Sequence, residues 1–307
     1  MIYYLIIGIV FFGQLFPPII GDADSVLVSS LDRHENIEMN VQEATTISDP
    51  GPIKTSESSG VHLTASSAIV IDKATGKILF QKEPDSQLSI ASITKLMTAF
   101  VFLENNPGFD KTGQIGVGEN SLEGSRVQVK SDDLMTIEDL FYASLVGSAN
   151  NATQALVHST GLTGEEFILE MNKKAKSLGM ENTFYIEPTG LNSGNVSTAN
   201  DLAKLGKVAF EKKEIRDATT RKEHTFITLG NNEFHKQTST NDLLDSYLNI
   251  TGGKTGFTYD ARYCLIIQAE NEQKNEVIAV VLDSESSNTR FQEMKALVTW
   301  TFANFQW

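Results

Sequence analysis

The stretch 92-SITKLMTAFVFL-103 places a serine and a lysine one helical turn apart, directly before a strongly apolar run. The apolar positions are spaced by three and four residues, which predicts an α-helix with one buried face. They are Ile93, Leu96, Met97, Phe100 and Leu103. Because residues i and i+3 share a helix face, we expect the Lys95 amine to reach the Ser92 hydroxyl.

This Ser-x-x-Lys spacing suits nucleophilic catalysis. A serine hydroxyl is a weak nucleophile until a base takes its proton, and lysine acts as that base only when its ammonium form is disfavoured. Burial or a second cation nearby would lower the Lys95 pKa. At a helix start, the Ser92 backbone N–H also points toward any oxyanion formed there. The pair alone arises by chance in many chains, so further motifs must support it.

Two downstream triplets supply candidates for a proton relay and a second cation. Ser148-Ala-Asn150 lies between two predicted helices, and Lys254-Thr-Gly256 precedes a strand-like stretch. Each triplet is weak alone, because Ser-x-Asn recurs at 193–195, 239–241 and 286–288 and Lys-Thr-Gly recurs at 111–113. The copy at 111–113 lies in the loop-like stretch 106-NPGFDKTGQIGVG-118, so we assign it no role.

The order of predicted elements indicates a mixed α/β (α+β) fold. A hairpin is predicted at 68–72 and 78–81 around Gly76, and further strands at 224–229, 233–238, 262–269 and 276–283. Helices are predicted at 136–147, 150–159, 164–179, 198–210 and, last, through 291–305. Strands near both ends therefore predict one sheet closed by distant segments, with an all-helical lobe inserted between them.

With these elements in order, the sequence resembles the penicillin-binding D-alanyl-D-alanine carboxypeptidase family. The resemblance covers about residues 66–307. It rests on "SIASITKLMTA" at 89–99, "GSRVQVK" and "TIEDLFYASLVGSANNA" between 124 and 152, "EPTGL" at 187–191, and "GGKTGFTYDARYCL" at 252–265. It implies a β-lactamase/DD-peptidase-like antiparallel sheet flanked by helices.

The resemblance also implies catalytic roles. Ser92 would be the acylated nucleophile and Lys95 its base. Ser148 would relay a proton to the leaving amine, Asn150 would bind the substrate amide, and Lys254 would add positive charge. The reaction would remove the terminal D-Ala of peptidoglycan stem peptides ending in D-Ala-D-Ala, and β-lactams would inhibit it.

Four residues after Lys254 are implied in substrate binding. Thr255 would bind the terminal carboxylate, and the Phe257 N–H would pair with that of Ser92 as the oxyanion hole. Gly256 would let the substrate backbone approach the strand, and Thr258 is the fourth implied substrate-binding residue. The chain departs from the family in two places that bear on carboxylate recognition.

The departures concern charge near the last strands. Relatives often place an arginine just before the final core strand, where this chain has Glu276, and Arg262 stands where a glycine is frequent. Acylation at Ser92 is therefore better supported by the sequence than the mode of carboxylate binding is.

Composition excludes several other functions. The net charge of −14 and the pI near 4.8 disfavour nucleic acid as a partner. No Cys/His cluster or His-Glu-x-x-His motif indicates a metal, and no cofactor is expected. The single cysteine, Cys264, lies in an apolar run and is read as a buried strand residue.

The N-terminal segment indicates export. Residues 2–20 are apolar except for Gln14, which predicts a signal peptide or a membrane anchor, with the anchor favoured because no good cleavage site follows. Residues 21–65 are polar and predict a disordered linker, so the catalytic domain is expected at 66–307. The enzyme is therefore expected outside the cytoplasm, in the cell envelope, anchored by its N-terminal segment or secreted.

Three rival functions remain open. An endopeptidase cutting D,D cross-links would use the same chemistry. A class A serine β-lactamase would share the three motifs and need a glutamate to activate water, for which Glu187 is the candidate. A non-catalytic wall-binding domain would be expected to lack the nucleophile or the lysine, and both are present.

Overall fold

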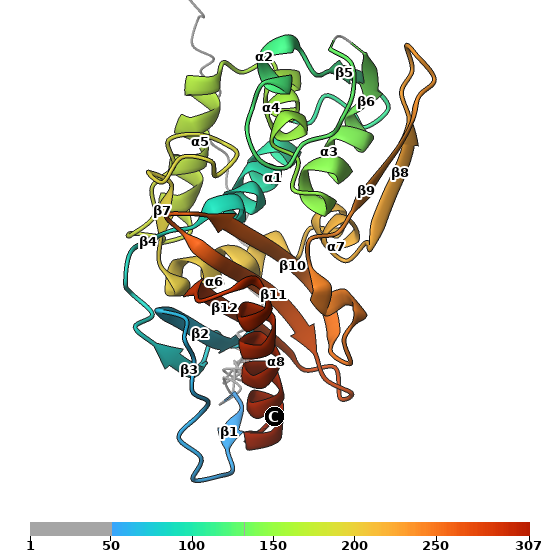
Figure 1. The fold of residues 1–307 in the computed structure, drawn as a ribbon. Helices are drawn as coiled ribbons and strands as arrows, with labels where there is room; N and C mark the ends of the chain where they lie inside the picture. Colours follow the sequence, from blue (N-terminus) through green and yellow to red (C-terminus); the bar gives the residue numbers. More distant parts are fainter. Residues whose placement is uncertain (1–50, 132) are drawn as a thin grey trace, which may run out of the picture. The chain divides into compact units, whose positions relative to one another are not determined.

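A five-stranded antiparallel sheet forms the centre of the fold. The computed structural model describes residues 51–131 and 133–307. The strands are β2 (Ser67–Asp72), β3 (Ile78–Lys82), β10 (Asn249–Thr258), β11 (Arg262–Glu270) and β12 (Glu276–Ser284), in the order β10-β11-β12-β2-β3 (Figure 1). Strands from the two ends of the described chain therefore pair directly, β2 with β12, which confirms the predicted sheet.

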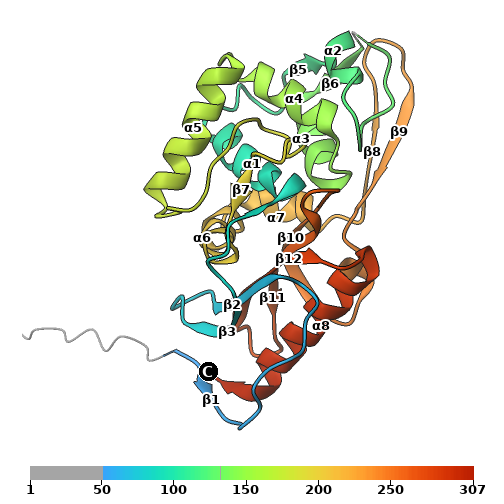
Figure 2. The ribbon, with the colours of Figure 1, turned by 60° about the vertical axis from the view of Figure 1, so that its left-hand side comes forward.

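Both faces of this sheet are buried. In β2, Ile69 and Ile71 belong to one hydrophobic cluster and Ala68 and Val70 to another, as the alternation of side chains along a strand requires. The first cluster includes α6 (Ala199–Ala209) and the second α8 (Ser287–Asn304). Figure 2 shows the two helices on opposite sides of the strands.

The helical lobe lies between β3 and β10 in the chain. Its helices are α1 (Thr94–Glu104), α2 (Val117–Asn120), α3 (Ile137–Val146), α4 (Asn150–Ser159), α5 (Gly164–Ser177) and α7 (Lys213–Thr219). Helix α1 is central, because it contacts α3, α4, α5, α6 and α7. Its residues from Thr94 to Phe102 are all buried. The prediction of an inserted helical lobe is confirmed.

Short strands and turns complete the fold. They pair as β1 (Ile53–Lys54) with β13 (Phe305–Gln306), β4 (Leu88–Ser89) with β7 (Val196–Ser197), β5 (Thr112–Gln114) with β6 (Leu134–Thr136), and β8 (Glu223–Ile227) with β9 (Phe234–Thr238). Two short 3₁₀ helices, η1 (Ala91–Ile93) and η2 (Asp242–Asp245), are also present.

The structure corrects the expected position of the Lys-Thr-Gly triplet. The triplet does not precede a strand but lies inside β10, where Lys254 pairs with Ile266 and Gly256 with Cys264. Local sequence does not show this, because the glycines at 252, 253 and 256 lower strand propensity. Pairing with β11 along nine residues makes the strand.

The structure also corrects the start of the folded domain. Residues 51–65, predicted as the end of a disordered linker, belong to the same unit as the sheet: β1 pairs with β13, and Leu63 and Ala65 are buried. Glu293 accepts hydrogen bonds from the backbone N–H groups of Thr64 and Ala65. Isolated apolar residues in a polar segment gave no periodic signal, so only tertiary contacts order it.

Residues 1–50 lie outside the described part of the chain. The predicted signal peptide or anchor at 1–20 and most of the predicted linker fall there. Within residues 51–131 and 133–307, no helix is both long and apolar enough to cross a membrane.

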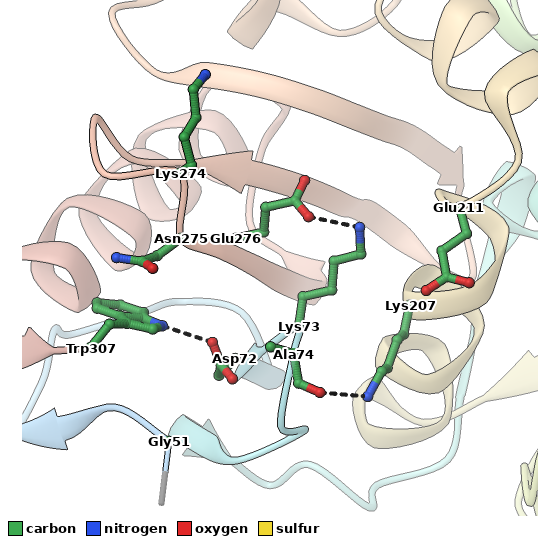
Figure 3. Close-up of a pocket in the computed structure, with 10 residues that line it drawn as sticks. All are labelled: Gly51, Asp72, Lys73, Ala74, Lys207, Glu211, Lys274, Asn275, Glu276 and Trp307. Carbon is green, nitrogen blue, oxygen red and sulfur yellow. Dashed lines mark hydrogen bonds and ion pairs between the residues drawn. The ribbon is translucent and has the colours of Figure 1, made fainter. Parts of the chain in front are cut away.

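A polar cavity of about 420 Å³ lies where Gly51, the end of β2, the start of β12 and the last described residue meet (Figure 3). There the Trp307 Nε1 donates a hydrogen bond of 2.7 Å to Asp72. Lys73 forms an ion pair of 2.8 Å with Glu276. These paired groups attach Trp307 and the β12 start to β2, and none of the predicted site residues lines this cavity.

Candidate active site

The predicted nucleophile and base are in contact. Ser92 lies in η1, immediately before α1, and the distance from Lys95 Nζ to Ser92 Oγ is 3.1 Å. Lys95 is completely buried. The three-residue spacing at a helix start thus places the amine against the hydroxyl, although Ser92 belongs to a 3₁₀ turn and not to the first α-helical turn as predicted.

The environment of Lys95 favours the neutral amine. Burial lowers its pKa from 10.5 to about 7, against an opposing effect of the Glu187 carboxylate. Lys95 Nζ donates to Asn150 Oδ1 at 2.7 Å and to the Thr189 carbonyl. A neutral amine has two hydrogens and one lone pair, so two donated bonds leave the lone pair for the Ser92 hydroxyl. This geometry suits transfer of a proton from Ser92 to Lys95.

A second lysine reaches the cleft from β10. Lys254 Nζ donates to Ser148 Oγ and to the Thr255 carbonyl, each at 2.9 Å. Burial, together with the charges of Lys95 and Arg290, holds its pKa well below the usual value. The structure thus brings both lysines and both predicted serines together, and Lys254 is placed to exchange a proton with Ser148.

Asn150 holds the Lys95 amine in place. Its Oδ1 accepts from Lys95, and its Nδ2 donates to the Glu123 carbonyl at 2.7 Å. The side-chain amide is thereby fixed by two partners, with one N–H hydrogen left for another acceptor. Asn150 is buried at the start of α4, next to Ser148, which has the left-handed φ of 58°. The sequence assigned it to substrate binding, and the geometry adds a positioning role.

Two glycines allow the cleft walls to close on Ser92. A Cβ on Gly256 would lie 2.8 Å from the Ile90 carbonyl oxygen and 3.2 Å from the Ser92 nitrogen. A Cβ on Gly190, whose φ is +83°, would lie 2.0 Å from the Ala91 carbonyl oxygen. Because no side chain fits at either position, β10 and the 187–191 loop approach the backbone of residues 90–92 directly.

The cleft has a volume of about 240 Å³. It is lined by Ser92, Gly124, Ser125, Ser148, Asn150, Gly190, Leu191, Thr240, Thr255, Gly256, Phe257, Thr258 and Arg290. The Thr255 hydroxyl bonds to that of Thr240, while Thr258 Oγ1 accepts from the Ala261 N–H at 3.1 Å. All four predicted substrate-binding residues therefore line the cleft, and Thr258 also stabilises the β10–β11 turn.

Arg290 is a site residue that the sequence analysis missed. It lies in the first turn of α8, 36 positions after Lys254, and its Nη1 donates to the Gly256 carbonyl at 3.0 Å. Its buried Nε has no partner among the described residues. No local motif marks this arginine, because only the packing of α8 against β11 brings it to the cleft. It supplies a cation to the cleft that Thr255 also lines.

Neither of the departures noted in the sequence reaches the cleft. Glu276 pairs with Lys73, and Arg262 lies 3.4 Å from Asp283. Cys264 is buried in β11, as predicted, and burial raises its thiol pKa to about 12, which disfavours a nucleophilic thiolate.

Among residues 51–131 and 133–307, no group of three His, Cys, Asp or Glu side chains is suited to a metal ion.

The Glu187 carboxylate forms its hydrogen bonds within its own loop. Its carboxylate accepts from the backbone N–H groups of Thr189 and Gly190, from the Thr189 hydroxyl, and from Asn195 Nδ2 at 3.0 Å. Asn195, from a second Ser-x-Asn triplet, also donates to Thr94 in α1. A base that activates water needs a free lone pair facing the acyl carbon. This carboxylate instead stabilises the loop that presents the Thr189 carbonyl to Lys95.

Comparison with solved structures places this fold and cleft in one class. The Streptomyces K15 DD-transpeptidase matches with a TM-score of 0.75 and 28% identity over 80% of this chain and all of that one. Penicillin binding protein 5 from Haemophilus influenzae matches with a TM-score of 0.74 and 30% identity over 81% of this chain and 74% of that one. The fold is that of the serine DD-peptidases.

Sequence comparison narrows the class to a family. The family model of peptidase family S11, described as D-alanyl-D-alanine carboxypeptidase, matches residues 53–286. A D-alanyl-D-alanine endopeptidase of Pseudomonas aeruginosa is 34% identical over 264 residues, 85% of each chain. The D-alanyl-D-alanine carboxypeptidase DacF of Bacillus subtilis is 30% identical over 251 residues, 79% of this chain and 63% of that one. The chain belongs to peptidase family S11.

Proposed function

We propose that this protein is a serine D,D-peptidase that cleaves the peptide bond after a D-alanyl residue in peptidoglycan stem peptides. The observation that carries the proposal is the buried Lys95 amine, whose Nζ lies 3.1 Å from Ser92 Oγ and is also bonded to Asn150 Oδ1 and the Thr189 carbonyl. A base with a pKa of about 7 is half neutral near physiological pH, which suits proton abstraction from serine.

The proposed reaction has two steps. Lys95 takes the Ser92 proton while Oγ attacks the carbonyl carbon of D-alanine, and the N–H groups of Ser92 and Phe257 stabilise the oxyanion. Ser148, which accepts a hydrogen bond from Lys254, delivers a proton to the amine of the leaving residue. That amine then departs, and an ester remains on Ser92. Water then hydrolyses the ester and restores Ser92.

Thr255 and Arg290 define the leaving-group end of the cleft. A free carboxylate on the leaving D-residue could bind there to the Thr255 hydroxyl and the Arg290 guanidinium. Both terminal D-Ala and the D-centre of a cross-linking residue carry such a carboxylate. The D-alanyl-D-alanine carboxypeptidase activity expected from the sequence therefore fits the cleft, and the 34% identity to a protein named endopeptidase supports cleavage of D,D cross-links as a second candidate.

A β-lactam presents a strained amide and a carboxylate in the same relation, so penicillins should acylate Ser92. Intact-mass measurement after incubation with benzylpenicillin tests the nucleophile. The wild type is expected to gain the mass of one penicillin, and Ser92→Ala is expected to gain none. Labelling that persists in Ser92→Ala would reject this assignment.

The two peptidase activities are separated by the products formed from defined muropeptides. A carboxypeptidase releases D-alanine from a monomeric pentapeptide, whereas an endopeptidase converts a cross-linked dimer into two monomers. Both substrates are incubated with equal amounts of enzyme and analysed by liquid chromatography with mass detection. Conversion of neither substrate, despite penicillin binding, would reject peptidase activity.

We further propose that the protein works in the cell envelope, outside the cytoplasm, where its peptidoglycan substrate lies. The apolar residues 2–20 support membrane anchoring or secretion. Fractionation of cells that express the full chain, followed by N-terminal sequencing, distinguishes the two: a soluble product that starts near residue 24 would reject the anchor.

A further inference from the structure

Three aromatic rings lie together at the end of the β10–β11 hairpin, beside the catalytic cleft. Phe257 and Tyr263 are cross-strand partners, and their rings stack with centroids 4.4 Å apart and an interplanar angle of 28°. The Tyr259 ring meets the Phe257 ring edge to face, with centroids 5.8 Å apart. We name these three rings the aromatic ledge. The proposed reaction uses the Phe257 N–H but none of the rings.

The aromatic ledge presents apolar surface to solvent. Phe257 is 45% exposed, Tyr259 is 93% exposed, and Tyr263 is partly buried. The turn that carries Tyr259 is held by a hydrogen bond of 3.1 Å from the Ala261 N–H to Thr258 Oγ1. Stacked rings on such a turn offer a large contact area that loses little side-chain freedom on binding, and contiguous exposed patches of this kind are typical of binding sites.

The ledge is continuous with the leaving-group end of the cleft. Thr255 and Phe257 are two residues apart on β10, so their side chains lie on the same face of the sheet. The Arg290 guanidinium lies 5.5 Å from the centre of the Tyr263 ring. Arg290, Thr255 and Phe257 all line the cleft. A residue whose carboxylate binds to Thr255 and Arg290 is therefore placed beside Phe257.

Phe257 supplies the apolar surface on this side of the cleft. Among the described residues that line the cleft, Phe257 and Leu191 are the only large apolar side chains. Leu191 belongs to the 187–191 loop and lies near Gly124, where an added Cβ would be 3.7 Å from Leu191 Cδ2. The methyl group of a leaving D-alanine would cover little of three rings, whereas a longer aliphatic arm would cover more of them.

We propose that the aromatic ledge binds the side chain of the leaving D-residue and favours a long aliphatic arm over the methyl group of D-alanine. In a D,D cross-link the leaving D-centre carries such an arm, which connects it to the rest of the second stem peptide. The ledge therefore favours cross-linked substrates over a terminal D-Ala. This inference rests on the proposed peptidase function and adds a specificity site to its cleft.

The test uses peptides of the form N-acetyl-Lys-D-Ala-D-X, in which X is alanine, norleucine or glutamine. Norleucine and glutamine have arms of similar length, but only the norleucine arm is apolar throughout. Each peptide is measured as a competitor of Ser92 acylation by a fluorescent penicillin, so binding is read whether or not the peptide is cleaved. The D-norleucine peptide is expected to bind roughly 5-fold more tightly than the D-alanine peptide, because its arm removes apolar surface from water. The D-glutamine peptide should stay within about 2-fold of the D-alanine peptide, because its amide loses hydration on the rings.

Two substitutions assign the preference to the aromatic ledge. Phe257→Ala removes a ring and keeps the backbone N–H, and Tyr259→Ser removes the most exposed ring. In each variant the ratio of norleucine to alanine affinity is expected to fall below about 2-fold. Tyr259→Ser decides alone if Phe257→Ala no longer reacts with penicillin. Tyr247→Ser is the matched control, because Tyr247 is 74% exposed and does not line the cleft, and it should retain the wild-type ratio.

The outcomes separate this inference from the proposed function. Acylation of wild-type Ser92 with equal competition by the three peptides, or with competition by none, would overturn the ledge and leave the acylation chemistry intact. A norleucine advantage that survives in Tyr259→Ser and in every acylating Phe257→Ala preparation would overturn it as well. Absence of penicillin acylation in the wild type would instead reject the proposed function.

Discussion

The completely buried Lys95 Nζ lies 3.1 Å from Ser92 Oγ, with Asn150 Oδ1 and the Thr189 carbonyl as its other partners. The amine is thus held by one side chain from α4 and one carbonyl from the 187–191 loop. These partners use both hydrogens of the neutral amine, so the protonation state of Lys95 decides whether Ser92 can react.

The rate of penicillin acylation should rise with pH through the Lys95 pKa. With a pKa of about 7, the neutral fraction grows about tenfold for each pH unit below 7 and levels off above pH 8. Stopped-flow acylation between pH 5 and 9 measures this profile. A rate that stays constant from pH 5 to 7 would contradict Lys95 as the base.

Replacement of the base by a permanent cation should abolish acylation. Lys95→Arg keeps positive charge but cannot lose its proton, so acylation is expected to fall by roughly 10³-fold or more. Circular dichroism and thermal melting establish that the variant is folded. Lys174→Arg, a change of a lysine on the surface of α5, is the matched control and should acylate at the wild-type rate.

Arg290 should contribute to binding of the terminal carboxylate. In Arg290→Gln the charge is lost, and the kcat/KM for a peptide with a free terminal carboxylate should drop by roughly 10- to 100-fold. The same peptide with a terminal carboxamide should lose less than about 3-fold, because it presents no anion. Equal losses for the two peptides would show that Arg290 acts only through the Gly256 carbonyl.

Glu187 should stabilise the fold without taking part in deacylation. Glu187→Gln replaces one carboxylate oxygen by an amide nitrogen, so either the Thr189 N–H or the Gly190 N–H loses its acceptor, which is expected to cost about 1–3 kcal/mol and to lower Tm by several degrees. The lifetime of the penicilloyl-enzyme should change by less than about 3-fold. A general base for deacylation would instead give an increase of roughly 10²-fold or more, and that result would favour a β-lactamase.

The N-terminal boundary predicts different stabilities for two truncations. A chain that starts at residue 51 retains β1, Leu63 and Ala65, and it should melt like the full-length protein. A chain that starts at residue 66 exposes the surface that Leu63 covers and loses the β1–β13 pairing, so it should lose about 2–3 kcal/mol. Thermal melts of both proteins measure this difference in stability. Identical Tm values would show that residues 51–65 do not stabilise the fold.

Local sequence determined the helical lobe, the β2–β3 hairpin and the Ser92–Lys95 contact. Each depends on the spacing of apolar residues along a helix or strand, or on a separation of three residues in a helix. Backbone geometry alone places residues with these spacings on the same face. The Ser148 and Lys254 triplets required resemblance to a family, because their spacing along the chain carries no geometric meaning.

Tertiary structure alone decided the remaining features. Arg290 enters the cleft because α8 packs on β11, and residues 51–65 are ordered by β13 and Glu293, more than 200 positions away. The depressed pKa of Lys95 likewise depends on burial by elements distant in sequence. A side chain's charge state, partners and exposure are set by what surrounds it in space, and a linear pattern does not contain that information.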